Sequence, residues 1–130
     1  MSCLFESLGR FVNLHPSQLR AEICNYLISD PVLVGELKTS QIVEHQPDIC
    51  TTTYENQDEQ SKLKKYVSEM SKPIVMGGAV EIIAFCNMYK KNVVVRQINH
   101  PDMKHIEFIG ENSTHTIAIS WNGGHYEPDM

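Results

Sequence analysis

The chain has 130 residues, a length that predicts a single domain spanning residues 1–130 around one hydrophobic core. Its formal net charge of -5 argues against nucleic acid or an anionic membrane as the main partner, because both favour clustered lysine and arginine. No apolar run approaches the roughly twenty residues that a membrane span needs, and the first residues lack the basic-then-apolar order of a secretory signal. We therefore expect a cytoplasmic protein.

Helical patterns dominate the first half of the chain. Apolar residues at helical spacing predict a helix over residues 3–12 and a second one from Pro16 or Ser17 to just before Asp30, with a proline in its first turn. We predict a short helical piece over residues 32–38. Residues 39–56 have no sustained period and predict a long connection, a kind of segment that often carries function.

The second half begins with helices and ends with strands. Helical spacing resumes over residues 57–70 and again over residues 79–89. Residues 92–98 are β-branched, and residues 105–109 and 114–121 alternate between apolar and polar side chains, so all three segments predict strands. This order favours an α+β fold in which helices pack on a small, mostly C-terminal β-sheet.

The four cysteines are Cys3, Cys24, Cys50 and Cys86. They form no C-x-x-C pair and have no histidine at zinc-ligand spacing, so we predict neither a disulfide framework nor a metal site. Cys24 and Cys86 fall within apolar helical patterns, which indicates small core side chains.

The two ends of the chain carry reactive groups. Cys3 opens the first predicted helix, where the partial positive charge of the helix end favours a thiolate. His125 lies near the other end, and Glu127 follows two residues later. If the fold joins the ends, the three residues form a cysteine–histidine–acid site in which a base activates the thiol and a third group orients the base. From residue chemistry alone, an incidental terminal thiol and a surface histidine remain alternatives.

The motifs resemble, in order, those of the ovarian tumour (OTU) family of cysteine proteases, which act as deubiquitinases. The matching segments cover nearly the whole chain: Cys3-Leu4-Phe5, Leu19-Arg20-Ala21-Glu22-Ile23 through Tyr26-Leu27, Gly77-Gly78 through Phe85 with the strand Val93-Val94-Val95, and His125-Tyr126-Glu127. Each motif alone is weak, but four in the correct order are fairly specific. The resemblance implies a papain-like OTU fold, ubiquitin or its conjugates as the partner, and no metal or organic cofactor. Ubiquitin-like modifiers remain open as further substrates.

The resemblance also implies a mechanism and a set of substrate-binding residues. His125 would take the proton of Cys3, whose thiolate would attack the carbonyl of the last ubiquitin glycine. The loop at Gly77 and Gly78 has no side chains, which would let the narrow Gly-Gly tail of ubiquitin approach the thiol. Gly123 and Gly124 suit the same purpose, and Trp121 would belong to the core or the cleft wall.

Two positions depart from the family pattern. Family members usually carry Asp-Gly-x before the nucleophile, where the aspartate helps to build the oxyanion-binding loop, whereas this sequence has Met1 and Ser2 before Cys3. Either the oxyanion site is built from little chain, or the natural domain begins upstream. The family more often has Asn or Asp two residues after the histidine, where this chain has Glu127. Asn122 is an alternative orienting group, and His115 is a fallback base.

Three functions remain open at this point. The first is a thiol-dependent deubiquitinase, and the second is an OTU-like ubiquitin-binding module with weak or no catalysis. The third is a protease that also processes a viral polyprotein, because a domain this compact resembles viral members of the family. A viral member would act in the host cytosol.

Overall fold

The computed structural model describes residues 3–43, 59–98, 105–110, 113–122 and 125–128. Its helices are α1 (Cys3–Val12), α2 (Pro16–Ile28), α3 (Thr39–Val43), α4 (Glu59–Met70) and α5 (Ala79–Tyr89). Its strands are β1 (Val32–Val34), β2 (Leu37–Lys38), β3 (Lys91–Gln97), β4 (His105–Phe108), β5 (His115–Trp121) and β6 (Tyr126–Pro128). Helices pack on a mixed sheet, so the predicted α+β fold is confirmed.

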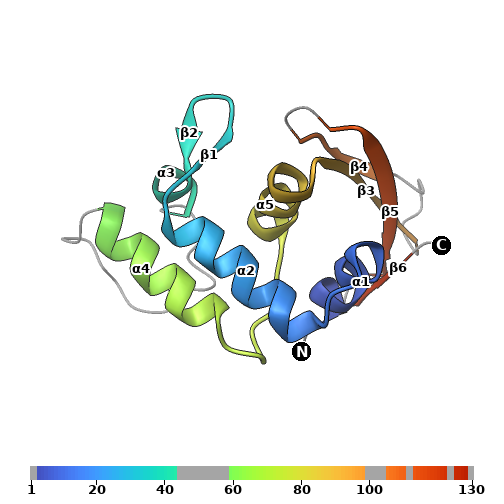
Figure 1. Ribbon diagram of the computed structural model, residues 1–130, viewed down its shortest axis with the longest axis horizontal. Coiled ribbons are helices and arrows are strands. Elements are labelled where there is room, and N and C mark those ends of the chain that lie inside the picture. The colour runs from blue at the N-terminus through green and yellow to red at the C-terminus, as the bar shows by residue number, and fades with distance from the viewer. Residues whose placement is uncertain (1–2, 44–58, 99–104, 111–112, 123–124, 129–130) are drawn as a thin grey trace.

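The larger sheet has the strand order β4-β3-β5-β6. The central strands β3 and β5 are parallel, whereas β4 and β6 are antiparallel to their neighbours. Alternate residues of the central strands, Val93, Val95, Ile117 and Ile119, are buried, as expected for a sheet with one covered face. Figure 1 shows the curved sheet with α1 and α5 on its inner side, and β6 beside α1. This topology brings β6, the last described strand, against α1.

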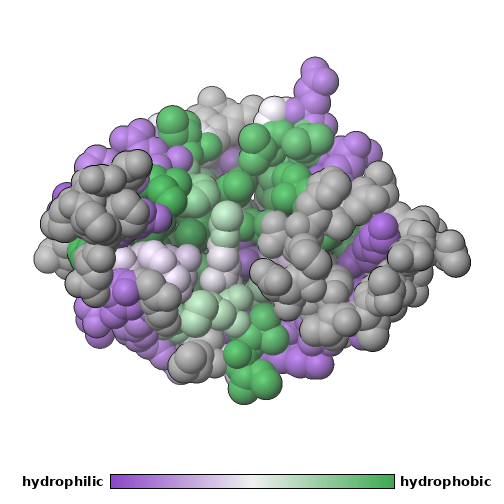
Figure 2. Space-filling view, turned by 180° about the vertical axis from the view of Figure 1, so that it is seen from behind, coloured by the Kyte–Doolittle hydropathy of each residue, from purple (hydrophilic) through white to green (hydrophobic). Residues whose placement is uncertain are grey.

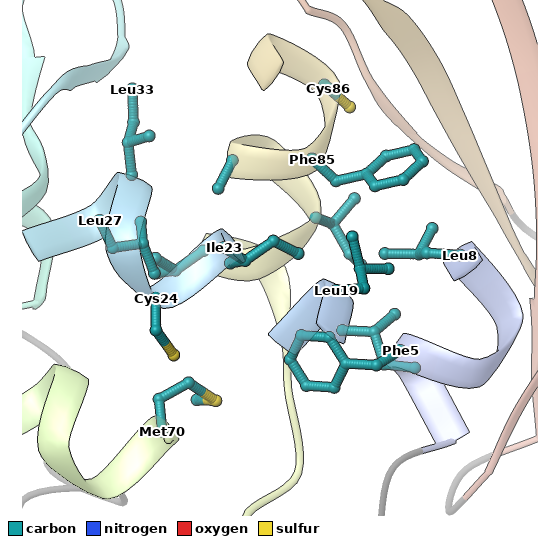
Figure 3. Close-up of a cluster of buried hydrophobic side chains, with 14 of the residues drawn as sticks. Phe5, Leu8, Leu19, Ile23, Cys24, Leu27, Leu33, Met70, Phe85 and Cys86 are labelled. Atoms are coloured by element: carbon teal, nitrogen blue, oxygen red, sulfur yellow. The ribbon is translucent and has the colours of Figure 1, made fainter. Parts of the chain in front are cut away.

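The core lies where α1, α2 and α5 meet the sheet. Figure 3 shows Phe5 and Leu8 of α1 facing α2 and α5, where Leu19, Ile23 and Phe85 point toward them. All five side chains are fully buried. Burying a side chain of this size contributes roughly 1.5–3 kcal/mol. The helix that begins at Cys3 is therefore held firmly by its own apolar face.

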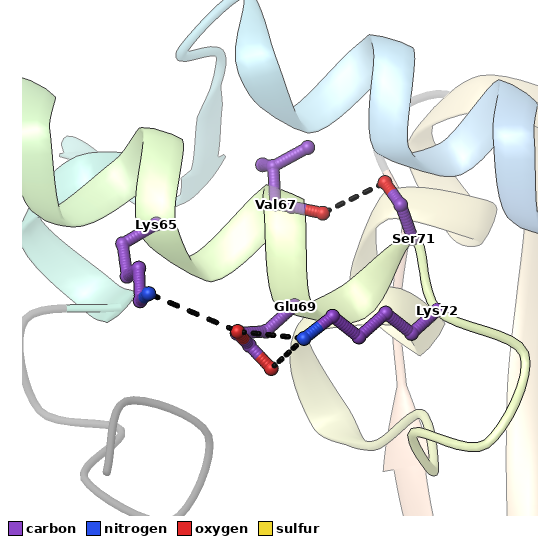
Figure 4. Close-up of polar contacts among 5 residues, drawn as sticks. All are labelled: Lys65, Val67, Glu69, Ser71 and Lys72. Atoms are coloured by element: carbon purple, nitrogen blue, oxygen red, sulfur yellow. Dashed lines mark hydrogen bonds and ion pairs between the residues drawn. The ribbon is translucent and has the colours of Figure 1, made fainter. Parts of the chain in front are cut away.

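The fourth helix covers the side of α2 away from the sheet (Figure 1). Its contact face includes Leu63 and Met70, which are fully buried. On the surface of α4, Glu69 Oε1 forms ion pairs with the Nζ atoms of Lys65 at 3.9 Å and Lys72 at 3.1 Å (Figure 4). These ion pairs are partly exposed and contribute at most about 1 kcal/mol each. Apolar burial, rather than charge, holds α4 in place.

Residues 32–38 form a β-hairpin, so the predicted short helical piece is wrong. Val32 pairs with Lys38 and Val34 with Leu37. Gly35 has a φ of 58°, the left-handed conformation that glycine adopts easily in hairpin turns. The β-branched valines favour a strand. In so short a segment, the spacing of apolar residues does not distinguish a helix from a strand.

The predicted long connection over residues 39–56 is also partly wrong, because residues 39–43 form α3. The helix begins next to the carboxylate of Asp30, which accepts hydrogen bonds from the backbone N–H of Ser40 at 2.8 Å and from its hydroxyl at 2.9 Å. A partner ten residues upstream thus satisfies the start of the helix, and helical periodicity does not reveal such a contact. Residues 44–56 lie outside the described residues.

The remaining predicted helices and strands are confirmed over the residues described, with ends that differ by one or two residues. Cys24 and Cys86 are buried within their helices, as predicted for core side chains. In the described part of the chain, no helix combines the length and the apolar character needed to cross a membrane.

Candidate active site

Cys3 is the first residue of α1 and has 6% of its surface exposed. The next two residues, Leu4 and Phe5, are buried in the core and hold the first helical turn. Inside the helix, the Ser7 hydroxyl donates a hydrogen bond of 2.8 Å to the carbonyl of Cys3. The thiol therefore lies on a firmly packed helix N-terminus, where backbone N–H groups and the helix dipole favour negative charge.

His125 lies between β5 and β6, directly before Tyr126. Its backbone N–H donates a 2.8 Å hydrogen bond to the Asn122 side-chain oxygen, and the Asn122 N–H donates to the His125 carbonyl at 3.2 Å. Trp121 and Tyr126 pair across the two strands, with ring centroids 4.5 Å apart. Asn122 thus contacts the backbone of His125 in this structure, and the aromatic pair fixes the strands on either side.

Glu127 contacts the ring of His125. Its Oε1 lies 3.8 Å from Nε2, and the two side chains are 63% and 49% exposed. A contact with that exposure, which is an ion pair only when the ring is protonated, contributes at most about 1 kcal/mol to stability. Because the carboxylate approaches Nε2, Nδ1 is the ring nitrogen that would serve a thiol.

The first helix and the last described strand lie side by side, since β6 packs against α1 (Figure 1). Burial raises the pKa of the Tyr126 hydroxyl, and the nearby Cys3 and Glu81 raise it further. A cavity of about 610 Å³ between the two elements is lined by Glu6 and His125, among others. No hydrogen bond joins the Cys3 thiol to the His125 ring, both of which are described residues; such bonds are often long in free enzymes and tighten when substrate binds.

The two glycines before α5 have different surroundings. A Cβ at Gly77 would lie 2.7 Å from Leu4 Cδ2 and 3.0 Å from Phe5 Cε2, whereas a Cβ at Gly78 would have no atom within 4 Å. Gly77 therefore makes room for the helix turn that follows Cys3. Gly78 faces open space, which leaves it suitable for a substrate tail. Gly123 and Gly124 lie outside the described residues.

A family model described as OTU-like cysteine protease matches residues 2–126. The chain belongs to the OTU-like cysteine protease family. Its structure is similar to the solved structure of the OTUD1 OTU domain, with a TM-score of 0.61, 15% sequence identity, and coverage of 98% of this chain and 77% of that one. This likeness shows the OTU fold. No curated protein sequence matches the chain.

In this OTU fold, His115 stands far from the cysteine. It begins β5, whereas Trp121 at the end of that strand pairs with Tyr126 beside His125. Six residue steps along a strand span about 20 Å. The His115 ring contacts the Thr114 hydroxyl at 2.9 Å. The fallback base is thus at the wrong end of the strand.

A second cavity, of about 550 Å³, lies between the β1–β2 hairpin and the end of β4. Figure 2 shows apolar residues gathered on this face, and the exposed ones include Val32, Val34 and Ile109. The cavity reaches Asn87, near the end of α5, whereas Gly78 caps the start of that helix. It therefore lies at the opposite end of α5 from Gly77, which packs against Leu4 and Phe5. Among the described residues, no group of three potential ligands could hold a metal ion.

Sequence patterns alone missed a set of buried polar side chains near this site. Arg20 and Glu81 are 4% and 1% exposed, and Tyr66, which the pattern placed on an apolar face, uses its hydroxyl to bind Glu81. The sequence held one sign of these buried charges: a charged residue stands next to apolar positions in both α2 and α5. The role of each charged side chain depends on tertiary partners, such as Met70 for Arg20 and Tyr66 for Glu81, which periodicity does not identify.

Proposed function

We propose that this protein is a thiol-dependent deubiquitinase, which hydrolyses isopeptide or peptide bonds after the C-terminal glycine of ubiquitin. The observation that carries the proposal is the position of Cys3 at the start of α1, beside the strand end that bears His125. Membership of the OTU-like cysteine protease family supports the thiol chemistry.

The reaction begins when His125 Nδ1 takes the proton of Cys3. The thiolate attacks the glycine carbonyl, a C–S bond forms, and backbone N–H groups at the start of α1 stabilise the negative oxygen. The intermediate collapses as the C–N bond breaks, and His125 gives its proton to the departing lysine amine. Water, activated by the same imidazole, then releases ubiquitin from the thioester.

Glu127 orients the imidazole in this mechanism. Its carboxylate approaches Nε2 at 3.8 Å, which favours the tautomer and the ring position that direct Nδ1 toward the sulfur. Because both side chains are about half exposed or more, water competes for the contact. Glu127 therefore contributes less than the nucleophile and the base.

The test is turnover of ubiquitin linked through its C-terminus to a lysine side chain. The wild-type chain should release free ubiquitin, and Cys3→Ala should not. Cys86→Ala is the matched control, because it removes a buried thiol at the far end of α5. Equal turnover by Cys3→Ala and the wild type would refute the proposal.

A ubiquitin-binding module with weak catalysis is the second candidate. The exposed and long His125–Glu127 contact favours it, because a loosely held base activates a thiol poorly. Stable ubiquitin binding without release of product would support this candidate and exclude the first. A viral origin, polyprotein processing and a cytoplasmic location stay predictions from the sequence.

A further inference from the structure

A connection between α4 and α5 passes directly beside the first turn of α1. It consists of residues 71–78 and is called the 71–78 loop below. Near its end, Gly77 lies so close to Leu4 and Phe5 that a single added carbon would approach their side chains to 2.7 and 3.0 Å. Leu4 and Phe5 are the two residues after Cys3 and are buried. The position of the loop therefore fixes the position of the turn that carries the thiol.

Arg20 of α2 holds the start of the loop. Its Nη1 donates a 2.7 Å hydrogen bond to the carbonyl of Met70, and its Nη2 donates a 3.4 Å bond to the carbonyl of Pro73. The guanidinium carbon also lies 4.2 Å from the centre of the Phe5 ring, a cation–π contact. One buried side chain thus contacts both the loop and the residue two positions after Cys3.

Glu81 of α5 holds the end of the loop. Its Oε1 accepts a 2.7 Å hydrogen bond from the backbone N–H of Gly78, and its Oε2 accepts a 2.6 Å bond from the Tyr66 hydroxyl. Glu81 and Tyr66 are each 1% exposed. The carboxylate therefore ties the glycine loop to α4 through contacts from which water is excluded.

The environment of Glu81 is costly for a carboxylate. Burial raises its pKa to about 6, and the contacts with Tyr66, Gly78 and Arg20 lower it in part. Among the described residues, Cys24 of α2 and Tyr126 of β6 are further titratable groups that act electrostatically with it. Burying an ionisable group costs stability unless its contacts offset the loss of water. Those contacts converge on the loop that packs against the nucleophile's helix.

We propose that Glu81, together with Tyr66 and Arg20, is a positioning residue for Cys3. By fixing both ends of the 71–78 loop, the three side chains press the loop against Leu4 and Phe5. The first turn of α1 is then held at the place where the thiol meets His125. This inference rests on the proposed role of Cys3 as nucleophile.

The experiment compares Glu81→Ala, Glu81→Gln and Tyr66→Phe with the wild type. Glu81→Ala removes both contacts, and its kcat should fall about 100-fold with KM within about threefold, because the misplaced group acts in the chemical step. Tyr66→Phe removes a single hydroxyl, keeps the ring in the core, and should lower kcat about 10-fold. Glu81→Gln keeps an acceptor for the Gly78 N–H and should restore kcat to within about threefold of the wild type.

Thr39→Val is the matched control. It removes a buried hydroxyl at the start of α3, away from the loop, that donates a 2.9 Å hydrogen bond to the carbonyl of Pro31. Its kcat should equal that of the wild type. A second readout is alkylation of Cys3 by iodoacetamide, measured by peptide mass spectrometry. Cys3 is 6% exposed, so loosening of the loop should speed its alkylation in Glu81→Ala and Tyr66→Phe, and not in Thr39→Val.

The two readouts separate the inference from the proposed function. If the wild type does not turn over ubiquitin conjugates, the proposed function fails, and the alkylation rates alone decide the inference. If the wild type is active while both variants keep its kcat and its alkylation rate, the positioning role is overturned. An equal loss of kcat in Glu81→Gln and Glu81→Ala would also overturn it. If Glu81→Ala does not fold, Tyr66→Phe carries the test.

Discussion

Replacing each glycine before α5 by alanine perturbs the loop beside Cys3 in two distinct ways. At Gly77 the new carbon would lie 2.7 Å from Leu4 Cδ2 and 3.0 Å from Phe5 Cε2, and both side chains are buried and cannot swing outward. Such overpacking costs roughly 1–3 kcal/mol. The smaller freedom of alanine in the unfolded chain returns about 0.4–1 kcal/mol where the backbone tolerates it. We therefore expect Gly77→Ala to lower the free energy of unfolding by about 1–2 kcal/mol.

Gly78→Ala is the matched control for stability, because its new carbon meets no atom within 4 Å. Its free energy of unfolding should fall by about 1 kcal/mol or less, because alanine is a poorer helix N-cap than glycine. The assay is urea unfolding of both variants, followed by circular dichroism at constant pH. Equal stability of the two variants, or a less stable Gly78→Ala, would refute the packing of the loop on α1.

Three further predictions concern charge and catalysis. Because burial raises the pKa of Glu81 from 4.5 to about 6, its contribution to stability is full below pH 4.5 and is lost as the pH rises through 6. The loss should be about 2 kcal/mol by urea unfolding, and Glu81→Gln should abolish that part of the pH dependence, whereas an unchanged slope would contradict the assignment. His125→Ala should lower kcat at least about 1000-fold in the turnover assay. Glu127→Ala should lower kcat only about 10-fold, because the contact between the carboxylate and the imidazole is long and exposed. Equal losses of kcat would show that Glu127 has a larger orienting role. Cys3→Ala should abolish turnover yet change the free energy of unfolding by about 1 kcal/mol or less, and a collapse of the fold would mean that its loss of activity says nothing about nucleophilicity.

The periodic elements could be predicted from the sequence because their signal is local. Helices α1 and α5 show apolar residues at helical spacing, and β3 is a run of β-branched residues. The same local signal failed at residues 32–38, where Gly35 and the valines form a hairpin in a segment too short for periodicity to decide. It failed again at α3, whose start is satisfied by Asp30 ten residues upstream.

The positions of candidate site residues could be predicted where a sequence motif contains them. The roles of residues that depend on packing could not. Cys3 was expected at a helix start and lies there. Gly77 and Gly78 looked equivalent in the sequence, but one packs on α1 and the other faces open space. Arg20 and Glu81 belong to helices whose periodicity implied only an apolar face. Their proposed role comes from contacts at the two ends of the 71–78 loop, which the sequence shows only as a connection between two helices.

The most direct test of the central claim is the reaction of the wild-type chain with ubiquitin that carries a thiol-reactive group at its C-terminus, followed by peptide mapping. We expect one covalent adduct, on Cys3, that is lost in His125→Ala and retained in Cys86→Ala. An adduct on another cysteine, or no adduct although ubiquitin binds, would contradict the claim that Cys3 is the nucleophile of a deubiquitinase.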